Sequence, residues 1–266
     1  MVNRFWGILF FMIPILGILS FVFAAYEVDP LKGAWLPENY SENGVAIDGL
    51  WYLVHYICGF IFLLTGLLLS WSILRYSSES RLAANYIKEN LTLELVWTII
   101  PGAILVGLAF YQLDVWSKQR VEAPTIESKD GVVLKPDNVR VVARQFGWEF
   151  YYPGADGQFD TLDDFHSDTE MVVPDDETIV VRLESRDVIH SYFVPKLRLK
   201  HDIVPGMLQR IWFTPLGQAE MDIVCAGLCG WGHYKMNATL RVVSRQEFDV
   251  WNLEQQNRIA APDLAP

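Results

Sequence analysis

Cysteine and basic residues are scarce in this chain, and each shortage argues against a class of protein. Only three cysteines occur among 266 residues, too few for a scaffold held together by disulfides. Lys and Arg number 21 against 32 Asp and Glu, a net charge of −11, and residues 121–266 carry 23 acidic and 14 basic side chains. Such an acidic surface argues against nucleic acid as a partner. It favours a basic protein that associates quickly at low salt, or simply keeps the domain soluble.

Long apolar runs occur only in the first 120 residues. Three of them are long enough to cross about 30 Å of hydrocarbon, namely residues 5–23, 50–73 and 96–113. Between the first two runs the only basic residue is Lys32. Basic residues before the first run and between the second and third are Arg4, Arg75, Arg81 and Lys88. This asymmetry predicts that the N-terminus and the 74–94 loop lie inside, and that everything after residue 113 lies outside.

The first run has a second interpretation as a cleavable signal peptide, with Arg4 ahead of it and a possible cut after Ala24. Its apolar stretch exceeds the usual length of about 7–15 residues, which favours a retained span. The predicted organisation is a transmembrane span or signal anchor at 1–25, an extracytoplasmic segment at 26–49, a transmembrane helical hairpin at 50–116, a linker at 117–137, a β domain at 138–245 and a tail at 246–266.

Short β-prone runs separated by turn residues follow the apolar part. They lie at 138–150, 178–184, 188–195, 207–213, 220–225 and 236–243. No amphipathic helical pattern appears before 246–256. This spacing predicts an antiparallel sandwich or a Greek-key barrel.

Two thiols, one imidazole and one thioether gather in a single segment, Cys225-Ala-Gly-Leu-Cys229-Gly-Trp-Gly-His233-Tyr-Lys-Met236. Soft sulfur together with imidazole is the ligand set expected for copper, and a thioether disfavours zinc. A further histidine, His190, lies upstream near another predicted strand, where it would complete the set. The alternative is a Cys225–Cys229 disulfide beside a surface histidine and a core methionine. Because all four residue types occur at this short spacing, the segment favours a copper site.

Glu94 stands at the inner start of the third apolar run. The simplest interpretation is a solvated carboxylate that the helix dipole favours. The alternative is the mouth of a proton path, because ionisable groups at membrane depth are often relays.

Several motifs in a fixed order make the chain resemble subunit II of the haem–copper cytochrome c oxidases, from about residue 50 to residue 243. They are Leu93-Glu94-Leu-Val-Trp97-Thr-Ile-Ile-Pro101, Gln145-Phe-Gly-Trp148-Glu-Phe150, Asp187-Val-Ile-His190-Ser-Tyr-Phe-Val-Pro195, Lys200-His-Asp202-Ile-Val-Pro205-Gly206 and the cysteine segment. The resemblance implies that the transmembrane helices, a hairpin plus one extra N-terminal span, precede an all-β, cupredoxin-like Greek-key sandwich.

The resemblance further implies a binuclear copper A centre in that sandwich. In such a centre Cys225 and Cys229 bridge two copper ions, and His190 and His233 bind one ion each. Met236 is a weaker ligand, and the backbone carbonyl of Gly227 completes the set. Haem is expected only in the partner subunit I. Glu94 matches the carboxylate at the mouth of the family's proton path.

The chain departs from the family pattern at two positions. Gly227 replaces the usual glutamate between the cysteines, so a magnesium or manganese site at the border with subunit I lacks a ligand. Phe146 replaces the tryptophan that usually receives electrons, and Trp148 follows two residues later, so we expect these two rings to form the electron inlet. No Cys-x-x-Cys-His motif follows the β domain, which excludes a fused c-type haem there. The donor is therefore expected to be a separate cytochrome c or a similar protein.

The implied function is to accept electrons from that donor and pass them to haem in subunit I, which reduces dioxygen to water and pumps protons. Subunit III and other subunits complete the complex. We expect a multi-pass protein of a prokaryotic inner membrane with a periplasmic C-terminal domain. Three alternatives are the copper A subunit of a nitric oxide reductase, which Gly227 mildly favours, a copper-free quinol oxidase subunit, and a membrane-tethered copper carrier. The complete ligand set disfavours the second, and the hairpin motif disfavours the third.

Overall fold

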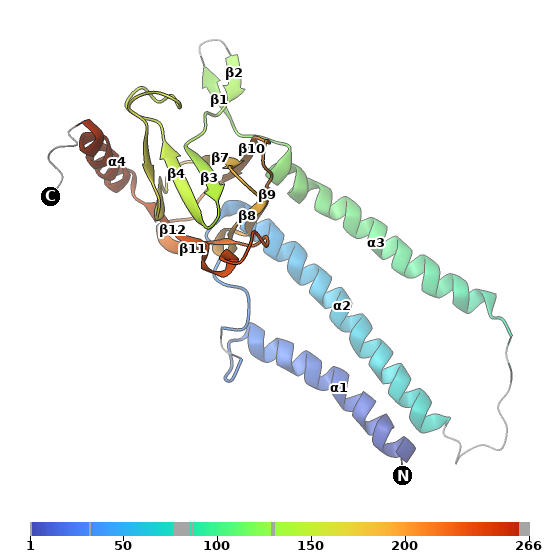
Figure 1. Cartoon of the computed structure of the whole chain (residues 1–266). Helices are drawn as coiled ribbons and strands as arrows, with labels where there is room; N and C mark the ends of the chain where they lie inside the picture. Colours follow the sequence, from blue (N-terminus) through green and yellow to red (C-terminus); the bar gives the residue numbers. More distant parts are fainter. Residues whose placement is uncertain (1, 32, 77–85, 87, 129–130, 261–266) are drawn as a thin grey trace. The chain divides into compact units, whose positions relative to one another are not determined.

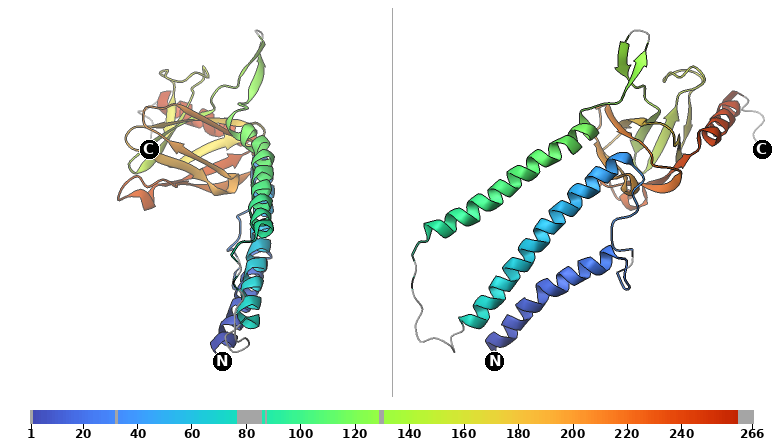
Figure 2. Two further views of the ribbon diagram at one scale, coloured as in Figure 1. Left: turned by 90° about the vertical axis from the view of Figure 1, so that its right-hand side faces the viewer. Right: turned by 180° about the vertical axis from the view of Figure 1, so that it is seen from behind.

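The computed structural model describes residues 2–31, 33–76, 86, 88–128 and 131–260, and Figures 1 and 2 show its helices and strands. The chain divides into two compact units. One comprises Met1–Pro37 and Asp48–Gln112, and the other comprises Glu38–Ile47 and Leu113–Pro266. The first unit is helical and the second is rich in β-structure. Two of the basic residues used to predict the membrane topology, Lys32 and Arg81, lie outside the described residues.

Three long helices lie in the N-terminal part of the chain: α1 (Val2–Ala25), α2 (Glu42–Arg75) and α3 (Leu91–Arg120). Each is long and apolar enough to cross a membrane, which confirms the predicted spans. α2 begins well before residue 50 because Ser41 caps it, its hydroxyl accepting a hydrogen bond from the Gly44 amide at 3.0 Å. Hydropathy marks only the membrane-crossing part of a helix, whereas a cap marks where its backbone begins.

Small residues let α1 and α2 pack closely. The buried Ser70 hydroxyl of α2 donates a 2.7 Å hydrogen bond to the Gly7 carbonyl of α1. A side chain at Gly66 would place its Cβ 2.7 Å from Pro14. α3, by contrast, has no buried residue. Its large apolar side chains are therefore available to lipid or to the helices of partner subunits.

Two five-stranded sheets form the β-rich unit. The first has the order β10 (Gln209–Phe213), β7 (Ile179–Ser185), β3 (Val139–Arg144), β4 (Gly147–Tyr152) and β5 (Phe165–Ser167). The second has the order β6 (Glu170–Pro174), β12 (Asn237–Val243), β11 (Ala219–Cys225), β8 (His190–Val194) and β9 (Leu199–Ile203). One buried apolar cluster takes side chains from both sheets, so they pack face to face. The predicted sandwich is confirmed.

The sequence suggested antiparallel pairing, but two of the strand pairs are parallel. β3 pairs with β7, and β12 pairs with β6, in parallel. Both pairs join strands that are not consecutive in the chain. Such pairs arise when a connection crosses from one sheet to the other, as in a Greek key.

Several boundaries differ from the sequence-based expectation. The run at 138–150 is two strands, β3 and β4, joined by a turn at Gln145 and Phe146. The segment at 117–137, expected as a linker, contains the end of α3 and a hairpin of β1 (Thr125–Ser128) with β2 (Gly131–Leu134). β-Branched residues such as Ile126, Val132 and Val133 favour strand over coil there. The tail forms α4 (Arg245–Ala260), within which the expected helical segment lies.

Three connections meet at one end of the sandwich, which we call the loop end. They are the β3–β4 turn (145–146), the β7–β8 loop (186–189) and the β11–β12 loop (226–236). The register brings them together, because β3 runs parallel to β7 and antiparallel to β4, and Cys225 at the end of β11 pairs with Tyr192 of β8. The short 3-10 turn η2 (His233–Lys235) lies within the last of these loops. All the predicted metal ligands lie at this end.

Candidate metal centre

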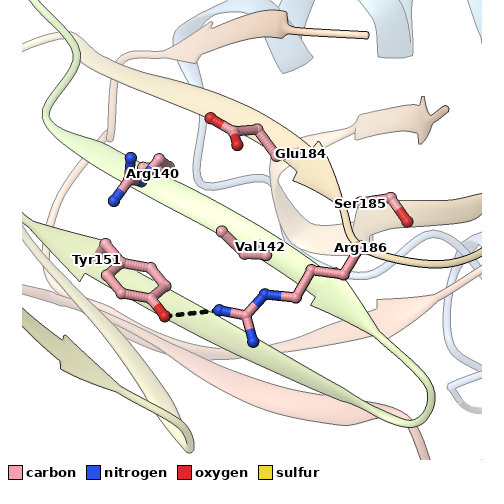
Figure 3. A pocket seen from close by; sticks show the side chains of 6 residues that line it. All are labelled: Arg140, Val142, Tyr151, Glu184, Ser185 and Arg186. Atoms are coloured by element: carbon pink, nitrogen blue, oxygen red, sulfur yellow. Dashed lines mark hydrogen bonds between the residues drawn. The ribbon is translucent and has the colours of Figure 1, made fainter. Parts of the chain in front are cut away.

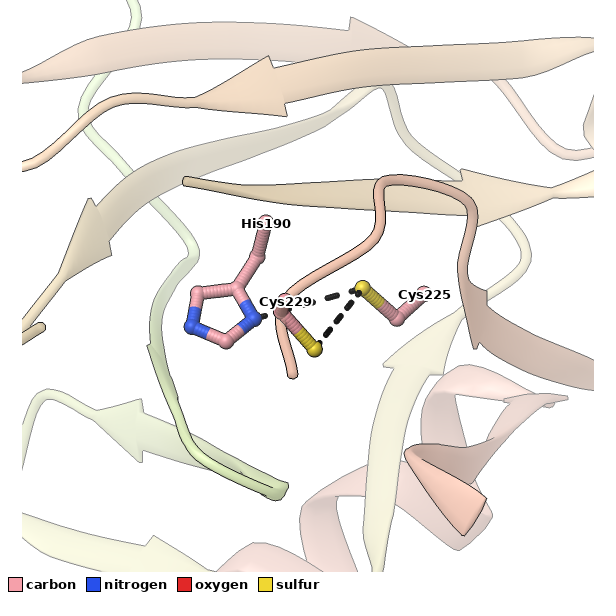
Figure 4. Close-up of side chains that lie close together, drawn as sticks. All are labelled: His190, Cys225 and Cys229. Atoms are coloured by element: carbon pink, nitrogen blue, oxygen red, sulfur yellow. Dashed lines mark hydrogen bonds between the residues drawn. The ribbon is translucent and has the colours of Figure 1, made fainter. Parts of the chain in front are cut away.

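The sulfur and nitrogen atoms of the predicted ligands converge at the loop end, and Figure 4 shows three of these side chains, those of His190, Cys225 and Cys229. The donor atoms of His190, Cys225 and Cys229 all lie within 4.8 Å of one another. Cys229 Sγ is also 3.6 Å from His233 Nδ1 and 3.8 Å from Met236 Sδ. The carbonyl oxygen of Gly227 lies 3.2 Å from Cys225 Sγ. The structure thus brings together every ligand that the sequence predicted.

The two cysteines do not form a disulfide. Their Sγ atoms are 3.9 Å apart and both thiols are free, whereas a disulfide requires about 2.05 Å. Both side chains are buried, as are those of His190 and Met236. His233 is partly exposed. A set of two thiols, two imidazoles and one thioether matches the soft-ligand chemistry of copper and disfavours zinc. The disulfide interpretation is wrong.

Backbone hydrogen bonds fix the shape of the β11–β12 loop. The Cys225 amide donates to the Met236 carbonyl at 3.1 Å, which closes the loop at its base. The Ala226 amide donates to the Ser191 carbonyl at 3.0 Å and attaches the loop to β8. From the neighbouring turn, the Gln145 side-chain amide donates to the Cys229 carbonyl. These hydrogen bonds therefore help to fix the positions of the candidate ligands.

A carboxylate orients His190. Asp187 Oδ1 lies 2.8 Å from His190 Nε2, while His190 Nδ1 faces Cys225 Sγ at 4.0 Å. Burial would raise the pKa of Asp187, but hydrogen bonds from His190 and from the amides of Gln145 and Val188 lower it. Because Asp187 stays ionised, it accepts the Nε2 proton and leaves Nδ1 free to bind a metal. Asp187 was not among the residues predicted to serve the site, although a carboxylate three residues before a candidate ligand is a signal that the sequence offers.

The two thiols differ in acidity. Burial alone would raise the pKa of Cys225, but hydrogen bonds with His190, the backbone of Ser191 and Gly227, and His233 lower it to about 6. Burial and the negative charge of Cys225 raise the pKa of Cys229 to about 11. Two adjacent thiolates repel each other, so a bound cation is needed to hold both deprotonated.

The two aromatic residues expected at the electron inlet lie in different environments. Phe146 is partly exposed at the β3–β4 turn. Trp148 is buried at 1% exposure, with its ring 6.4 Å from that of His190 and 5.8 Å from that of Tyr192. Because it belongs to the core, Trp148 cannot touch an incoming donor protein. Strand β4 carries it inward, whereas the turn carries Phe146 outward.

Glu94 lies in the first turn of α3 and is exposed. This agrees with the expected helix-start position, and the role of the side chain stays a prediction.

A hollow of about 260 Å³ lies on the surface of β3, β4 and β7, and none of its lining residues is a predicted metal ligand (Figure 3). Two arginines line it, but both are already paired. Arg140 contacts Asp160 at 2.6 Å. Arg186 contacts Glu149 at 2.6 Å and the Tyr151 hydroxyl at 2.9 Å. These arginines stabilise the sheet surface and are not part of the metal centre.

Comparisons with known proteins agree with this geometry. The family described as cytochrome C oxidase subunit II, periplasmic domain, matches residues 139–243, and the transmembrane domain of the same subunit matches residues 31–115. The alternative cytochrome c oxidase subunit 2 of Bradyrhizobium diazoefficiens is 28% identical over 276 residues, which cover 96% of this chain and 92% of that protein. Cytochrome c oxidase subunit 2 of Cereibacter sphaeroides is 29% identical over 239 residues, 76% of this chain and 75% of that protein.

A solved structure is also similar in sequence. The periplasmic domain of subunit II of the cytochrome oxidase of Bradyrhizobium japonicum is 30% identical and covers 46% of this chain and 94% of its own, with a TM-score of 0.41.

Proposed function

The chain belongs to the cytochrome c oxidase subunit II family, and from this membership we propose that it is the electron-accepting subunit of a haem–copper oxidase. It is a membrane protein with a periplasmic-type β domain. We place it in a prokaryotic inner membrane, where it takes electrons from a cytochrome c and passes them to haem in subunit I. That subunit reduces dioxygen to water and pumps protons. Subunit III and others complete the assembly.

The observation that carries this proposal is the convergence of two thiols, two imidazoles, a thioether and a carbonyl in one largely buried cluster. In a copper A centre the thiolates of Cys225 and Cys229 and the imidazoles of His190 and His233 would hold the two copper ions. Met236 and the Gly227 carbonyl are the weaker ligands. When bound, the two copper ions store one electron between them.

The protein's own contribution is to keep these ligands still. The loop is hydrogen-bonded at its base and to β8 and the β3–β4 turn, and Asp187 fixes the imidazole of His190. Ligands that keep their positions when the charge changes lower the reorganisation that accompanies each transfer. Burial excludes water from both sulfur atoms.

The isolated complex that contains this chain tests the function. It should oxidise reduced cytochrome c and consume dioxygen in proportion. Consumption of nitric oxide in place of dioxygen would favour the reductase alternative, although the relatives described above are named as oxidase subunits.

We further propose that Glu94, exposed at the start of α3, is the mouth of a proton path. Glu94→Gln removes the titratable carboxylate and is expected to slow turnover about tenfold or more, while reduction of the copper centre by cytochrome c stays unchanged. Glu89→Gln is the matched control, because Glu89 is also exposed and pairs only at the surface with Lys88. Oxygen uptake and proton uptake are measured for the complexes that carry each of the two variants in vesicles. Equal rates in the Glu94 variant and the control would show that Glu94 is only a solvated residue.

A further inference from the structure

An exposed aromatic side chain lies in the middle of the ligand loop. Trp231 is 80% exposed, and it stands two residues after Cys229 and two residues before His233. A large apolar side chain held in water at a functional loop is commonly a contact for a partner. The sequence motif contains Trp231 but does not by itself indicate a role for it.

The exposed ring of Trp231 contacts the ring of Phe146, which in turn packs on the backbone of the ligand loop. Their ring centroids are 5.3 Å apart, and the rings meet edge to face at 64°. The Phe146 ring lies directly on the loop backbone, because a Cβ at Gly232 or Gly230 would come within 2.5 or 3.0 Å of it. Both glycines adjoin Trp231, and Gly230 also adjoins Cys229. The pair therefore extends from solvent to the loop backbone next to Cys229.

We propose that Trp231 is the residue on which the donor's exposed haem edge docks, and that Phe146 supports its ring. This inference rests on the proposed function. One electron leaves the ferrous haem, which becomes ferric, and reduces the copper pair by one electron. Trp231 supplies the contact and is neither oxidised nor protonated at the end of the transfer.

Other residues of the loop end meet these requirements less well. Tyr234 is 78% exposed, but the group that contacts its ring is the Lys235 ammonium, 5.4 Å from the ring centroid, rather than another aromatic ring. Leu228 is 85% exposed but has no π-system. Trp148 is buried. Among the described residues of this end, Trp231 combines exposure with an aromatic neighbour packed on the ligand loop.

Charge around Trp231 is mixed, although the domain as a whole is acidic. Lys235 lies over the Trp231 ring at 5.9 Å, and the nearby Asp187 is hydrogen-bonded to His190. Arg144 and Arg186 flank the neighbouring connections, and both pair with Glu149. Groups of acidic residues instead follow β4 and β6 at the opposite end of the sandwich: Asp156, Asp160, Asp163, Asp164, Asp175, Asp176 and Glu177.

A strand of five or six residues spans about 15–20 Å, which exceeds the screening length of about 10 Å at 0.1 M salt. Docking at Trp231 should therefore depend on apolar contact and change little with salt. The sequence-based expectation of a salt-sensitive encounter with a basic partner follows from the charge of the whole domain, not from the charge at this site.

The test uses the full chain in detergent, loaded with copper, and two reduced monohaem cytochromes c as probes, one basic and one acidic. Trp231→Leu should lower the second-order rate of copper reduction by both probes about tenfold or more, the loss expected when an aromatic anchor is removed. Trp231→Phe should recover part of the rate. Tyr234→Leu, the matched control in the same loop, should stay within about twofold of the wild type.

Two further measurements distinguish a loss of docking from damage to the metal centre. Hexaammineruthenium(II), a small reductant that needs no docking surface, should reduce wild type and Trp231→Leu at equal rates. The metal-free chain should bind a zinc-porphyrin cytochrome c more weakly after Trp231→Leu, a result independent of copper loading. Unchanged cytochrome rates and unchanged binding in Trp231→Leu would overturn the inference. Trp231→Leu would also overturn it if the rates were unchanged and the oxidase complex failed to assemble, because a partner subunit would then cover Trp231. A wild-type chain that neither cytochrome reduces would instead overturn the proposed function.

Discussion

Replacing either Cys225 or Cys229 by serine is expected to abolish the dicopper centre. A serine hydroxyl has nearly the shape of the thiol but is a hard ligand that stays protonated, so it cannot bridge two copper ions. The sulfur atoms are 3.9 Å apart in the buried site, and no other thiol can substitute, because the third cysteine, Cys58, lies on α2. Both variants should lose the visible absorbance expected of a copper–thiolate centre and retain fewer than two copper ions per chain.

Met236→Leu is the matched control for this experiment. Leucine keeps the buried volume but removes the thioether 3.8 Å from Cys229 Sγ. This variant should hold two copper ions with a changed reduction potential, because a weak axial ligand tunes copper more than it anchors it. Circular dichroism should show the same β-fold in all three variants. A native spectrum in either serine variant would refute the bridging assignment.

Gly230→Ala is expected to damage the centre without changing any ligand. Gly230 has φ +137°, and an added Cβ would lie 2.9 Å from Gln145 Nε2 and 3.0 Å from the Phe146 ring. The methyl group would therefore add backbone strain and push away the side chain that hydrogen-bonds the Cys229 carbonyl. We expect the free energy of unfolding to fall by about 3 kcal/mol and copper to bind at least about tenfold more weakly.

Gly217→Ala separates the two causes. Gly217 has a similar φ of +140°, but nothing lies within 4 Å of its would-be Cβ, and it lies between β10 and β11, at the other end of β11 from the ligands. This variant should lose about 1–2 kcal/mol from strain alone and keep its copper affinity. Chemical denaturation and copper titration of both variants give the comparison. Equal copper affinity in the two would mean that the packing of the β3–β4 turn against the loop does not hold the ligands.

The spans and the ligands were predictable because the information is local. The membrane-crossing part of each long helix is one apolar run, and four of the candidate ligand side chains occur within twelve residues. When so many metal-binding side chains occur in one short segment, the site can be predicted with little knowledge of the tertiary structure. His190 is more distant in the chain, but its sequence motif and its place at the end of a predicted strand indicated it as a candidate ligand.

What the sequence could not show depends on packing. Trp148 and Phe146 are two residues apart, yet one belongs to the core and the other to a turn, because the strand break at Gln145 has no glycine or proline before it. β9 was missed because it is an edge strand with only its two ends buried, so its middle has a polar sequence. The exposure of Trp231 likewise follows from the loop fold, since nothing in the spacing distinguishes a solvent-facing tryptophan from a core one.

Copper content and electron spin resonance of the full chain test the central claim most directly. After loading in detergent, the account predicts two copper ions per chain that share one unpaired electron, as in a mixed-valence pair bridged by Cys225 and Cys229. A single mononuclear ion, or no bound copper in a correctly folded chain, would contradict it.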